Sequence, residues 1–163
     1  FEVTGPVFID FSPQAVPVGG KFLINGDALY EIESVLINGV SAEFDLYQPK
    51  IIVCTVPEGA TSGTITITGP GGTVSSGIDL TIIQAPEVSG FAPTSGSAGT
   101  LVRVTGKELT FVKAVYIRDL ETDFTIHSDT ELDIVIPEGA KTGPITVATP
   151  GGVARTNDIF RVN

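Results

Sequence analysis

The chain contains very few of the residues on which catalytic and metal sites are usually built. It has 1 cysteine, 1 histidine, no tryptophan and no methionine among 163 residues. A single cysteine cannot form an internal disulfide, and there is no C-x-x-C pair to hold zinc. The sequence therefore gives no support for a disulfide scaffold or a zinc site, and its cysteine content leaves the cellular compartment open.

Basic residues are also scarce. There are 9 Lys and Arg against 19 Asp and Glu, so the net charge is -10, and residues 1–83 hold only 2 of the bases. Such a surface repels phosphate backbones and anionic lipids, which argues against nucleic acid as a partner. No apolar run approaches the roughly 18 residues of a membrane span, so we expect no direct membrane insertion. Because no signal peptide precedes Phe1, we expect a mature chain or a fragment of a longer one.

The chain carries the same passage twice. VPEGATSGTITITGPGG at 56–72 returns as IPEGAKTGPITVATPGG at 136–152, and a shift of 80 residues aligns 11–83 with 91–163 without a gap. The recurring residues are glycines, prolines and alternating apolar residues, which mark turns and core-facing positions. Self-similarity at a fixed period indicates a duplicated structural unit. We therefore expect two domains, residues 1–84 and 85–163.

The alternation of apolar and polar residues predicts strands throughout. Ile52, Cys54 and Val56 alternate with other residues at period 2, and no long stretch shows a helical stripe. Asn38-Gly39 between two apolar runs predicts a two-residue hairpin turn. The pattern predicts an all-β chain of two tandem immunoglobulin-like β-sandwiches, although the immunoglobulin Cys…Trp…Cys signature is absent. The expected strands, about seven in each unit, lie near 6–11, 21–26, 34–37, 43–46, 51–56, 64–69, 78–83, 87–91, 101–106, 114–118, 123–126, 131–136, 144–149 and 157–162.

The repeated passage is explained by turn chemistry. We expect 57–59 to turn the chain out of one strand, Gly63 to open the next, and 70–72 to form the last hairpin. Gly26 and Gly106 end matched strands, where a bulge or a positive φ is the expected reason for glycine. Only Gln84 and Ala85 separate the units before Pro86, so we expect a stiff joint and units stacked end to end.

These motifs resemble the IPT/TIG family (immunoglobulin-like, plexin, transcription factor). Both copies have P-x-x-x-x-F-x-P, P-x-G-x-x-x-G-x-I and a closing P-G-G. The second copy also completes P-x-G-x-x-x-G-x-I-x-V and adds Ser128, Thr130 and Leu132. The first copy departs at 47–50, where Ser and Thr are missing, so we expect a different loop shape there. The resemblance implies non-catalytic domains of receptors, of bacterial surface proteins or of transcription factors. The acidic charge argues against the last group, and low Lys content with Gly/Thr/Val-rich strands favours a bacterial source.

No residue is identified as catalytic or as a cofactor ligand. His127, Ser128 and Asp129 are adjacent, and neighbouring strand residues point to opposite faces, so they do not form a triad. We expect His127 to be a solvated loop histidine. Cys54 lies on the apolar side of a strand and is expected to be a small buried hydrophobe.

The acidic residues at 119–133 were considered as a metal site. Asp119-x-Glu121-x-Asp123 resembles the start of an EF-hand loop, but that loop needs Gly at position six and Glu at position twelve. Phe124 and Thr130 occupy those positions here. We assign no metal ligand and favour a solvated acidic face, while a looser calcium site stays open as an alternative.

Four aromatic residues are the candidates for contact with a ligand or partner. Tyr30 and Phe111 fall in the loop after the second expected strand of each unit, and Tyr47 and Tyr116 complete the set. Most phenylalanines occupy repeat-matched or alternating apolar positions, and the absence of tryptophan removes the usual platform for sugars. These four residues are the candidates for a small glycan or protein contact, with ordinary loop packing as the alternative at Tyr30 and Phe111.

The leading expectation is a non-catalytic extracellular or cell-surface module, without cofactor, of a bacterial surface protein. It would act as a spacer and interaction domain that presents a glycan-binding or catalytic domain. Its partners would be neighbouring domains or other subunits, with glycan as a further candidate. Two alternatives stay open: a self-assembling subunit of a filament, sheath or phage surface, and a direct carbohydrate-binding module.

Overall fold

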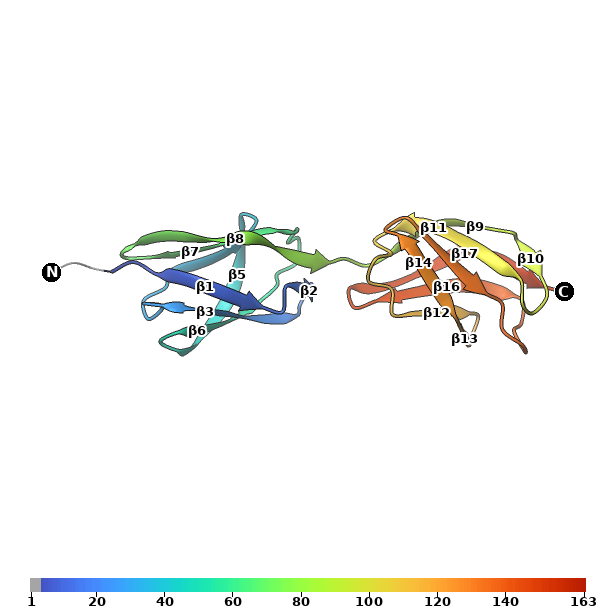
Figure 1. Ribbon diagram of the computed structural model, residues 1–163, viewed down its shortest axis with the longest axis horizontal. Coiled ribbons are helices and arrows are strands. Elements are labelled where there is room, and N and C mark those ends of the chain that lie inside the picture. Colours follow the sequence, from blue (N-terminus) through green and yellow to red (C-terminus); the bar gives the residue numbers. More distant parts are fainter. Residues whose placement is uncertain (1–3) are drawn as a thin grey trace. The chain divides into compact units, whose positions relative to one another are not determined.

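The computed structural model describes residues 4–163, and every regular element in that range is a β-strand. The chain divides into two compact units, the first ending at Ile82 and the second beginning at Ile83. Figure 1 draws the strands of the first unit in blue to green and those of the second in yellow to red. Residues 1–3 of the expected first domain lie outside the described residues. Within the described range no helix has the length and apolar character of a membrane crossing.

The first unit is a sandwich made from one sheet that folds over on itself. Its strands follow the order β1-β3-β6-β5-β4-β7-β8-β2. The start of β5 pairs with β4 and the rest of it pairs with β6, so this strand belongs to both layers. The strands are β1 (Val7–Ser12), β2 (Ala15–Pro17), β3 (Lys21–Asp27), β4 (Ser34–Ile37), β5 (Val40–Gln48), β6 (Ile51–Thr55), β7 (Gly63–Gly69) and β8 (Gly72–Ile83).

The second unit repeats this arrangement as two separate sheets, β14-β15-β11-β9 and β10-β17-β16-β12-β13. The counterpart of β5 is interrupted at Asp123, which divides it into β13 and β14. The strands are β9 (Glu87–Ala92), β10 (Ser95–Gly96), β11 (Leu101–Lys107), β12 (Ala114–Ile117), β13 (Leu120–Thr122), β14 (Phe124–Ser128), β15 (Glu131–Val135), β16 (Gly143–Thr149) and β17 (Gly152–Val162).

Each unit has its own apolar core. Phe22, Ile24 and Leu80 are among the fully buried residues of the first, and Val102, Leu132 and Phe160 are among those of the second. They alternate with exposed or half-buried residues along the strands, as the period-2 pattern predicts. A fully buried aliphatic or phenyl side chain stabilises the fold by about 1.5–3 kcal/mol, so these positions carry most of the stability of each unit.

The expected strands and turns are present. Asn38-Gly39 joins Ile37 to Val40 in a two-residue hairpin, with φ of 44° at Asn38 and 86° at Gly39. The last hairpin of the first unit pairs Gly69 with Gly72, as expected from the Pro-Gly-Gly sequence. At the turn that begins the repeated passage, the backbone N–H of Ala60 donates to the carbonyl of Pro57 (3.3 Å), and Ala140 does the same to Pro137 (3.3 Å).

The strand prediction was incomplete in two respects. The short strands β2, β10 and β13 were not predicted, because two or three residues are too few to show a period. The last strand of each unit was predicted too short: β8 and β17 begin directly after the Pro-Gly turn. Irregular register within both strands breaks the alternation that would have revealed them.

Gly26 and Gly106 are required for a reason that was only partly predicted. Both lie in strands beside a bulge of the partner strand, and neither has a positive φ, so that alternative is wrong. A Cβ at Gly26 would overlap the carbonyl oxygen of Val7, and one at Gly106 would overlap that of Glu87. Close approach of a neighbouring backbone therefore excludes any side chain here.

The turn at 47–50 does not have the different shape that its sequence suggested. The N–H of Leu29 donates to the carbonyl of Pro49 (3.3 Å), and at the matched position Leu109 donates to Asp129 (3.0 Å). Both copies also have a register shift in the strand before this turn. Backbone hydrogen bonds keep the shape, so the missing Ser and Thr change only side-chain contacts.

Candidate interaction surface

The four predicted aromatic residues are divided between the two units. Tyr30 and Tyr47 are exposed in the first unit (56% and 70%), and Phe111 is exposed in the second (37%), where Tyr116 is half-buried. Tyr30 lies in the β3–β4 loop, whose Leu29 bonds the turn that follows Tyr47. These two are therefore placed at one end of the first unit. Tyr116 lies on β12 between Glu121 and Thr146.

A larger apolar area lies on the outer side of the sheet formed by β1, β3, β6 and the end of β5. Leu23 is directly opposite Val53, and antiparallel partners share a face of the sheet. Leu23 is 42% exposed and Ile9, at the bulge of β1, is 59% exposed. We call this area the apolar face and define it by Ile9, Leu23, Tyr47, Ile51 and Val53. One polar pair lies on the same side of the sheet: Asn25, opposite Ile51, donates a hydrogen bond to Asp10.

At the matched positions the second unit has a network of charged side chains. Arg103 donates to both carboxylate oxygens of Asp133, from Nε at 2.8 Å and from a terminal nitrogen at 3.1 Å. Nε2 of His127 lies 2.7 Å from Oδ2 of Asp133, and Glu131 lies 3.9 Å from Arg103. We call these four residues the charged face. His127 therefore lies in strand β14 with a partner, so its assignment to a loop was wrong, whereas its side chain is solvated as expected (41% exposed).

The charged face changes the acidity of its central carboxylate. Hydrogen bonds from Arg103, supported by His127, lower the pKa of Asp133 from 3.8 to about 2, against the opposing effect of burial. Among residues 4–163, Asp133 is the one charged residue that is buried. A buried carboxylate is tolerated here because cationic or hydrogen-bonding groups occupy both of its oxygens.

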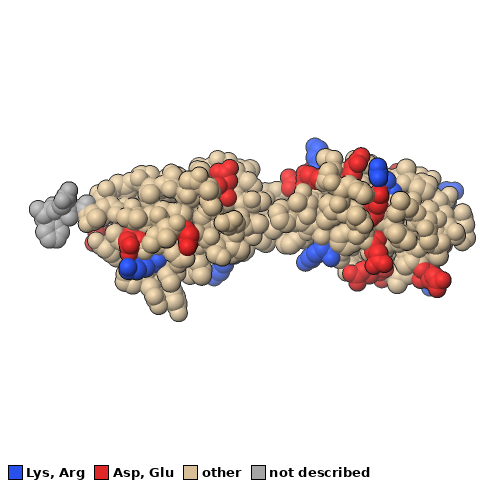
Figure 2. All heavy atoms as spheres, viewed as in Figure 1, with Lys and Arg blue, Asp and Glu red and all other residues tan. Residues whose placement is uncertain are grey.

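Each of the five residues that define the apolar face has a polar or charged counterpart in the second unit. Adding 80 to each residue of the apolar face gives Ser89, Arg103, His127, Glu131 and Asp133. At the next pair of outward-facing residues along the same strands, the first unit is polar and the second is apolar. Lys21 opposite Thr55 in the first unit corresponds to Leu101 opposite Val135 in the second. The sequence does contain a signal for these positions: an apolar residue in one copy is replaced by a charged or polar residue 80 positions later. Figure 2 shows the resulting contrast: on the visible side the second unit carries more charged residues than the first.

An open hollow adjoins the apolar face in the first unit. It has a volume of about 440 Å³ and is lined by Lys21, Ala42, Glu43, Phe44, Asp45 and Thr55. Asp45 is directly opposite Val53, so the hollow and the apolar face are continuous. The second unit has a hollow of about 400 Å³ at the matched place, lined by Glu121, Thr122, Asp123 and Phe124.

The acidic residues at 119–133 do not gather into one cluster in the structure. Asp129 accepts hydrogen bonds from the backbone N–H of Glu108 and Thr110 and from the Thr110 hydroxyl (2.7 Å). The Thr110 hydroxyl and these amides lower the pKa of Asp129. Within residues 4–163 no three His, Cys, Asp or Glu side chains lie close enough together to hold a metal ion.

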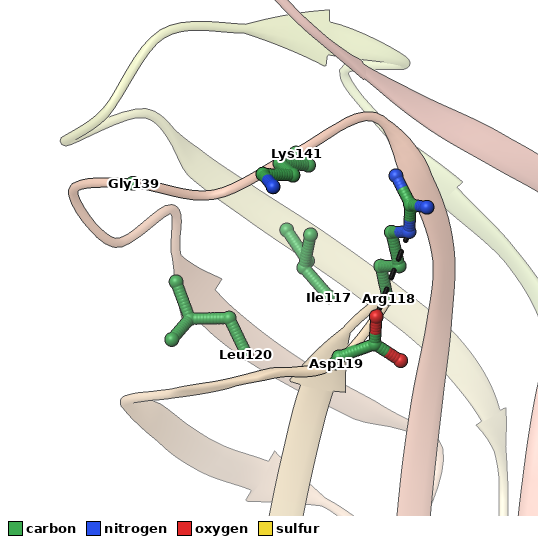
Figure 3. A pocket seen from close by; sticks show the side chains of 6 residues that line it. All are labelled: Ile117, Arg118, Asp119, Leu120, Gly139 and Lys141. Carbon is green, nitrogen blue, oxygen red and sulfur yellow. Dashed lines mark ion pairs between the residues drawn. The ribbon is translucent and has the colours of Figure 1, made fainter.

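A further hollow lies at the β12–β13 hairpin of the second unit. Its volume is about 210 Å³, and Figure 3 shows the six residues that line it: Ile117, Arg118, Asp119, Leu120, Gly139 and Lys141. Arg118 pairs with Asp119 at 3.6 Å, drawn as the dashed line. At the matched place in the first unit, the Asn38 amide donates to the Thr61 hydroxyl (2.8 Å).

Cys54 is fully buried in the first core, as predicted. Burial raises the pKa of its thiol to about 12. The reactive form of cysteine is the thiolate, so this residue is chemically inert in the folded chain.

Comparison with known proteins agrees with this fold. Residues 6–82 match the family model of the IPT/TIG domain, and no curated protein sequence matches the chain. The extracellular region of plexin A4, domains 1 to 10, covers all of the chain (100%) with 19% identity and a TM-score of 0.58, over 16% of its own length.

Two bacterial structures are similar at lower scores. SGBP-B from a complex xyloglucan utilization locus in Bacteroides uniformis has 17% identity and a TM-score of 0.47, with 96% of this chain and 49% of its own covered. The surface glycan-binding protein PbSGBP-B from Prevotella bryantii has 17% identity and a TM-score of 0.45, with 97% and 41% covered. The chain thus spans less than half the length of each of these proteins. Its first unit is an IPT/TIG domain, and a second immunoglobulin-like unit repeats that fold.

Proposed function

We propose that the chain is a non-catalytic interaction and spacer module from the extracellular part of a bacterial surface protein, where it holds and presents a glycan-binding or catalytic domain. The observation that carries the proposal is the pairing of an IPT/TIG domain, residues 6–82, with a second unit of the same design. The extracellular region of plexin A4, which has the same fold over the whole chain, supports the placement outside the cell.

The residues whose side chains could take part in catalysis have structural roles in this proposal. Asp133 is bound to both His127 and Arg103 on a sheet surface. Cys54 is buried with a raised pKa. A nucleophile needs a base within hydrogen-bonding reach, and these residues instead stabilise the two sandwiches.

Light scattering of the purified chain tests the proposal against the self-assembling alternative. The module should have the mass of one chain at micromolar concentration. A filament, sheath or phage-surface subunit would form open-ended polymers, because heterologous contacts that do not close continue indefinitely. Polymers whose size grows with concentration would contradict the proposal.

A glycan array tests it against direct carbohydrate binding. The proposal expects no binding to polysaccharides, because the chain has no tryptophan to stack on a sugar ring. Binding that is lost on replacing both Tyr30 and Tyr47 by Ala would instead assign a glycan site to the end of the first unit.

A further inference from the structure

We propose that the apolar face of the first unit binds a protein partner that presents apolar side chains, with a Lys or Arg placed beside Glu43 and Asp45. This inference rests on the proposed interaction function and deepens it by naming the surface and the chemistry of its partner.

The apolar face is not needed to build the fold. Its residues alternate with core residues such as Ile24, Ile52 and Cys54, and they point away from the core. In the second unit the same sheet forms with Arg103 and Asp133 in place of Leu23 and Val53. Apolar residues at these positions expose hydrocarbon to water, although the second unit forms the same sheet without them. Exposed apolar areas mark interaction sites on soluble domains.

The charges around the apolar face define the partner. Asp10, Glu43 and Asp45 form no ion pair within the described residues, and Asp27 is already paired with Lys50 (2.7 Å). Lys21 is the one base on the strands that form this sheet. An acidic rim attracts a partner whose own rim is basic and repels one that is acidic.

The hollow beside the apolar face is the place where the basic residue of the partner would bind. Glu43 and Asp45 line its 440 Å³ together with Thr55 and one base, Lys21, so the two carboxylates outnumber the base, and Asp45 adjoins Val53 of the apolar face. A Lys or Arg side chain can reach the two carboxylates there while the neighbouring residues of the partner cover Leu23 and Val53. Arginine and lysine also have aliphatic stems that pack on apolar surface.

The same features disfavour the other occupants. Two copies of the chain joined by this face would bring Asp10, Glu43 and Asp45 close to their own duplicates, which is repulsive. Anionic lipid is repelled in the same way. A glycan needs hydrogen-bonding groups and several stacking rings. The apolar face has a single ring, Tyr47, and its other four residues, Ile9, Leu23, Ile51 and Val53, are aliphatic, which favours a protein as the occupant.

The test uses a phage-displayed library of random peptides selected on the intact chain. Enriched peptides should combine apolar residues with Lys or Arg. Synthetic copies should bind the double variant Leu23→Arg/Val53→Asp on the order of tenfold more weakly or worse, because charges replace the centre of the contact. The variant Glu43→Gln/Asp45→Asn should also bind more weakly and should lose most of the dependence of binding on salt.

A matched control places the same two charges on the other layer of the first sandwich. Leu36 and Thr66 are directly opposite each other in β4 and β7, so Leu36→Arg/Thr66→Asp reproduces the change away from the apolar face. This variant should bind the peptides as the original chain does. Thermal unfolding of all variants shows that each remains folded.

Several results would overturn the inference. These are failure to enrich any peptide, enriched peptides without basic residues, and equal binding to the Leu23→Arg/Val53→Asp variant. Self-association or glycan binding that this variant abolishes would assign the face to a second copy or to a sugar. Failure of the proposed function is separate, since it is judged from polymers of the original chain in light scattering.

Discussion

Arg103 holds Asp133 through two hydrogen bonds, of 2.8 and 3.1 Å, at the two positions where the first unit has Leu23 opposite Val53. The fold is indifferent to this exchange, because both pairs lie on the outer side of an equivalent sheet. The duplicated chain thus keeps its core and turns while its surfaces diverge.

This pair makes the stability of the second unit depend on pH. The folded chain lowers the pKa of Asp133 from 3.8 to about 2, so folding favours the ionised form. The stabilisation is complete above the unfolded pKa and is lost as pH falls through about 2. Melting temperature should therefore drop between about pH 5 and pH 2, and Asp133→Asn should be less stable at neutral pH with a weaker acid dependence. Equal acid dependence in the variant would show that other carboxylates dominate.

Gly26 and Gly106 should tolerate no side chain. The carbonyls of Val7 and Glu87 occupy the space that a Cβ would need, so Val at either position should cost more than about 1 kcal/mol of unfolding free energy. Gly90 is the control, because it lies in the same strand pair and its nearest neighbour to a Cβ is 3.8 Å away. Urea unfolding measures the difference. A Gly106→Ala variant as stable as Gly90→Ala would contradict the overlap.

Asp129 should stabilise the loop that it bonds. Replacement by Ala leaves the N–H groups of Glu108 and Thr110 and the Thr110 hydroxyl without their acceptor, which should cost about 1 kcal/mol. Thr110→Val removes one of these bonds and should cost less. Urea unfolding of both variants gives the comparison, and a neutral Asp129→Ala would mean that water replaces the carboxylate at no cost.

Cys54 should be unreactive and structurally useful. A thiol with a pKa of about 12 in a closed core should resist thiol reagents in the folded chain and react only on unfolding. Cys54→Ala should lose roughly 1–3 kcal/mol of stability through a small cavity. Rapid labelling of the folded chain would contradict its burial, and loss of a binding activity with stability intact would contradict its purely structural role.

The sequence predicted the parts of the fold that rest on local chemistry. Alternation located the strands of both cores, and Asn38-Gly39 located a hairpin, because side chains and φ at these positions obey short-range rules. The overlap at Gly26 depends on β1, which is distant in sequence, so only its bulge could be anticipated. The equal shape of the matched turns at Pro49 and Asp129 was not predicted. Backbone hydrogen bonds determine this shape, and they cannot be read from the side chains in the sequence.

The candidate site was predicted less well than the fold. Tyr30 and Tyr47 were identified one by one as aromatic residues, and the structure places both at one end of the first unit. The apolar face went unnoticed because Leu23 and Val53 look like ordinary strand residues until the direction of each strand is known. His127 was assigned to a loop because its partner Asp133 lies across a turn.

The central claim is that the face positions are free of any role in folding and are therefore available for function. Amide NMR spectra of the Leu23→Arg/Val53→Asp variant test it most directly. The account predicts a dispersed spectrum in which shifts change only around β1, β3, β5 and β6, while amides of the opposite sheet keep their positions. Changes that spread through the first unit, or a collapse of dispersion, would show that the apolar face is part of the folding core.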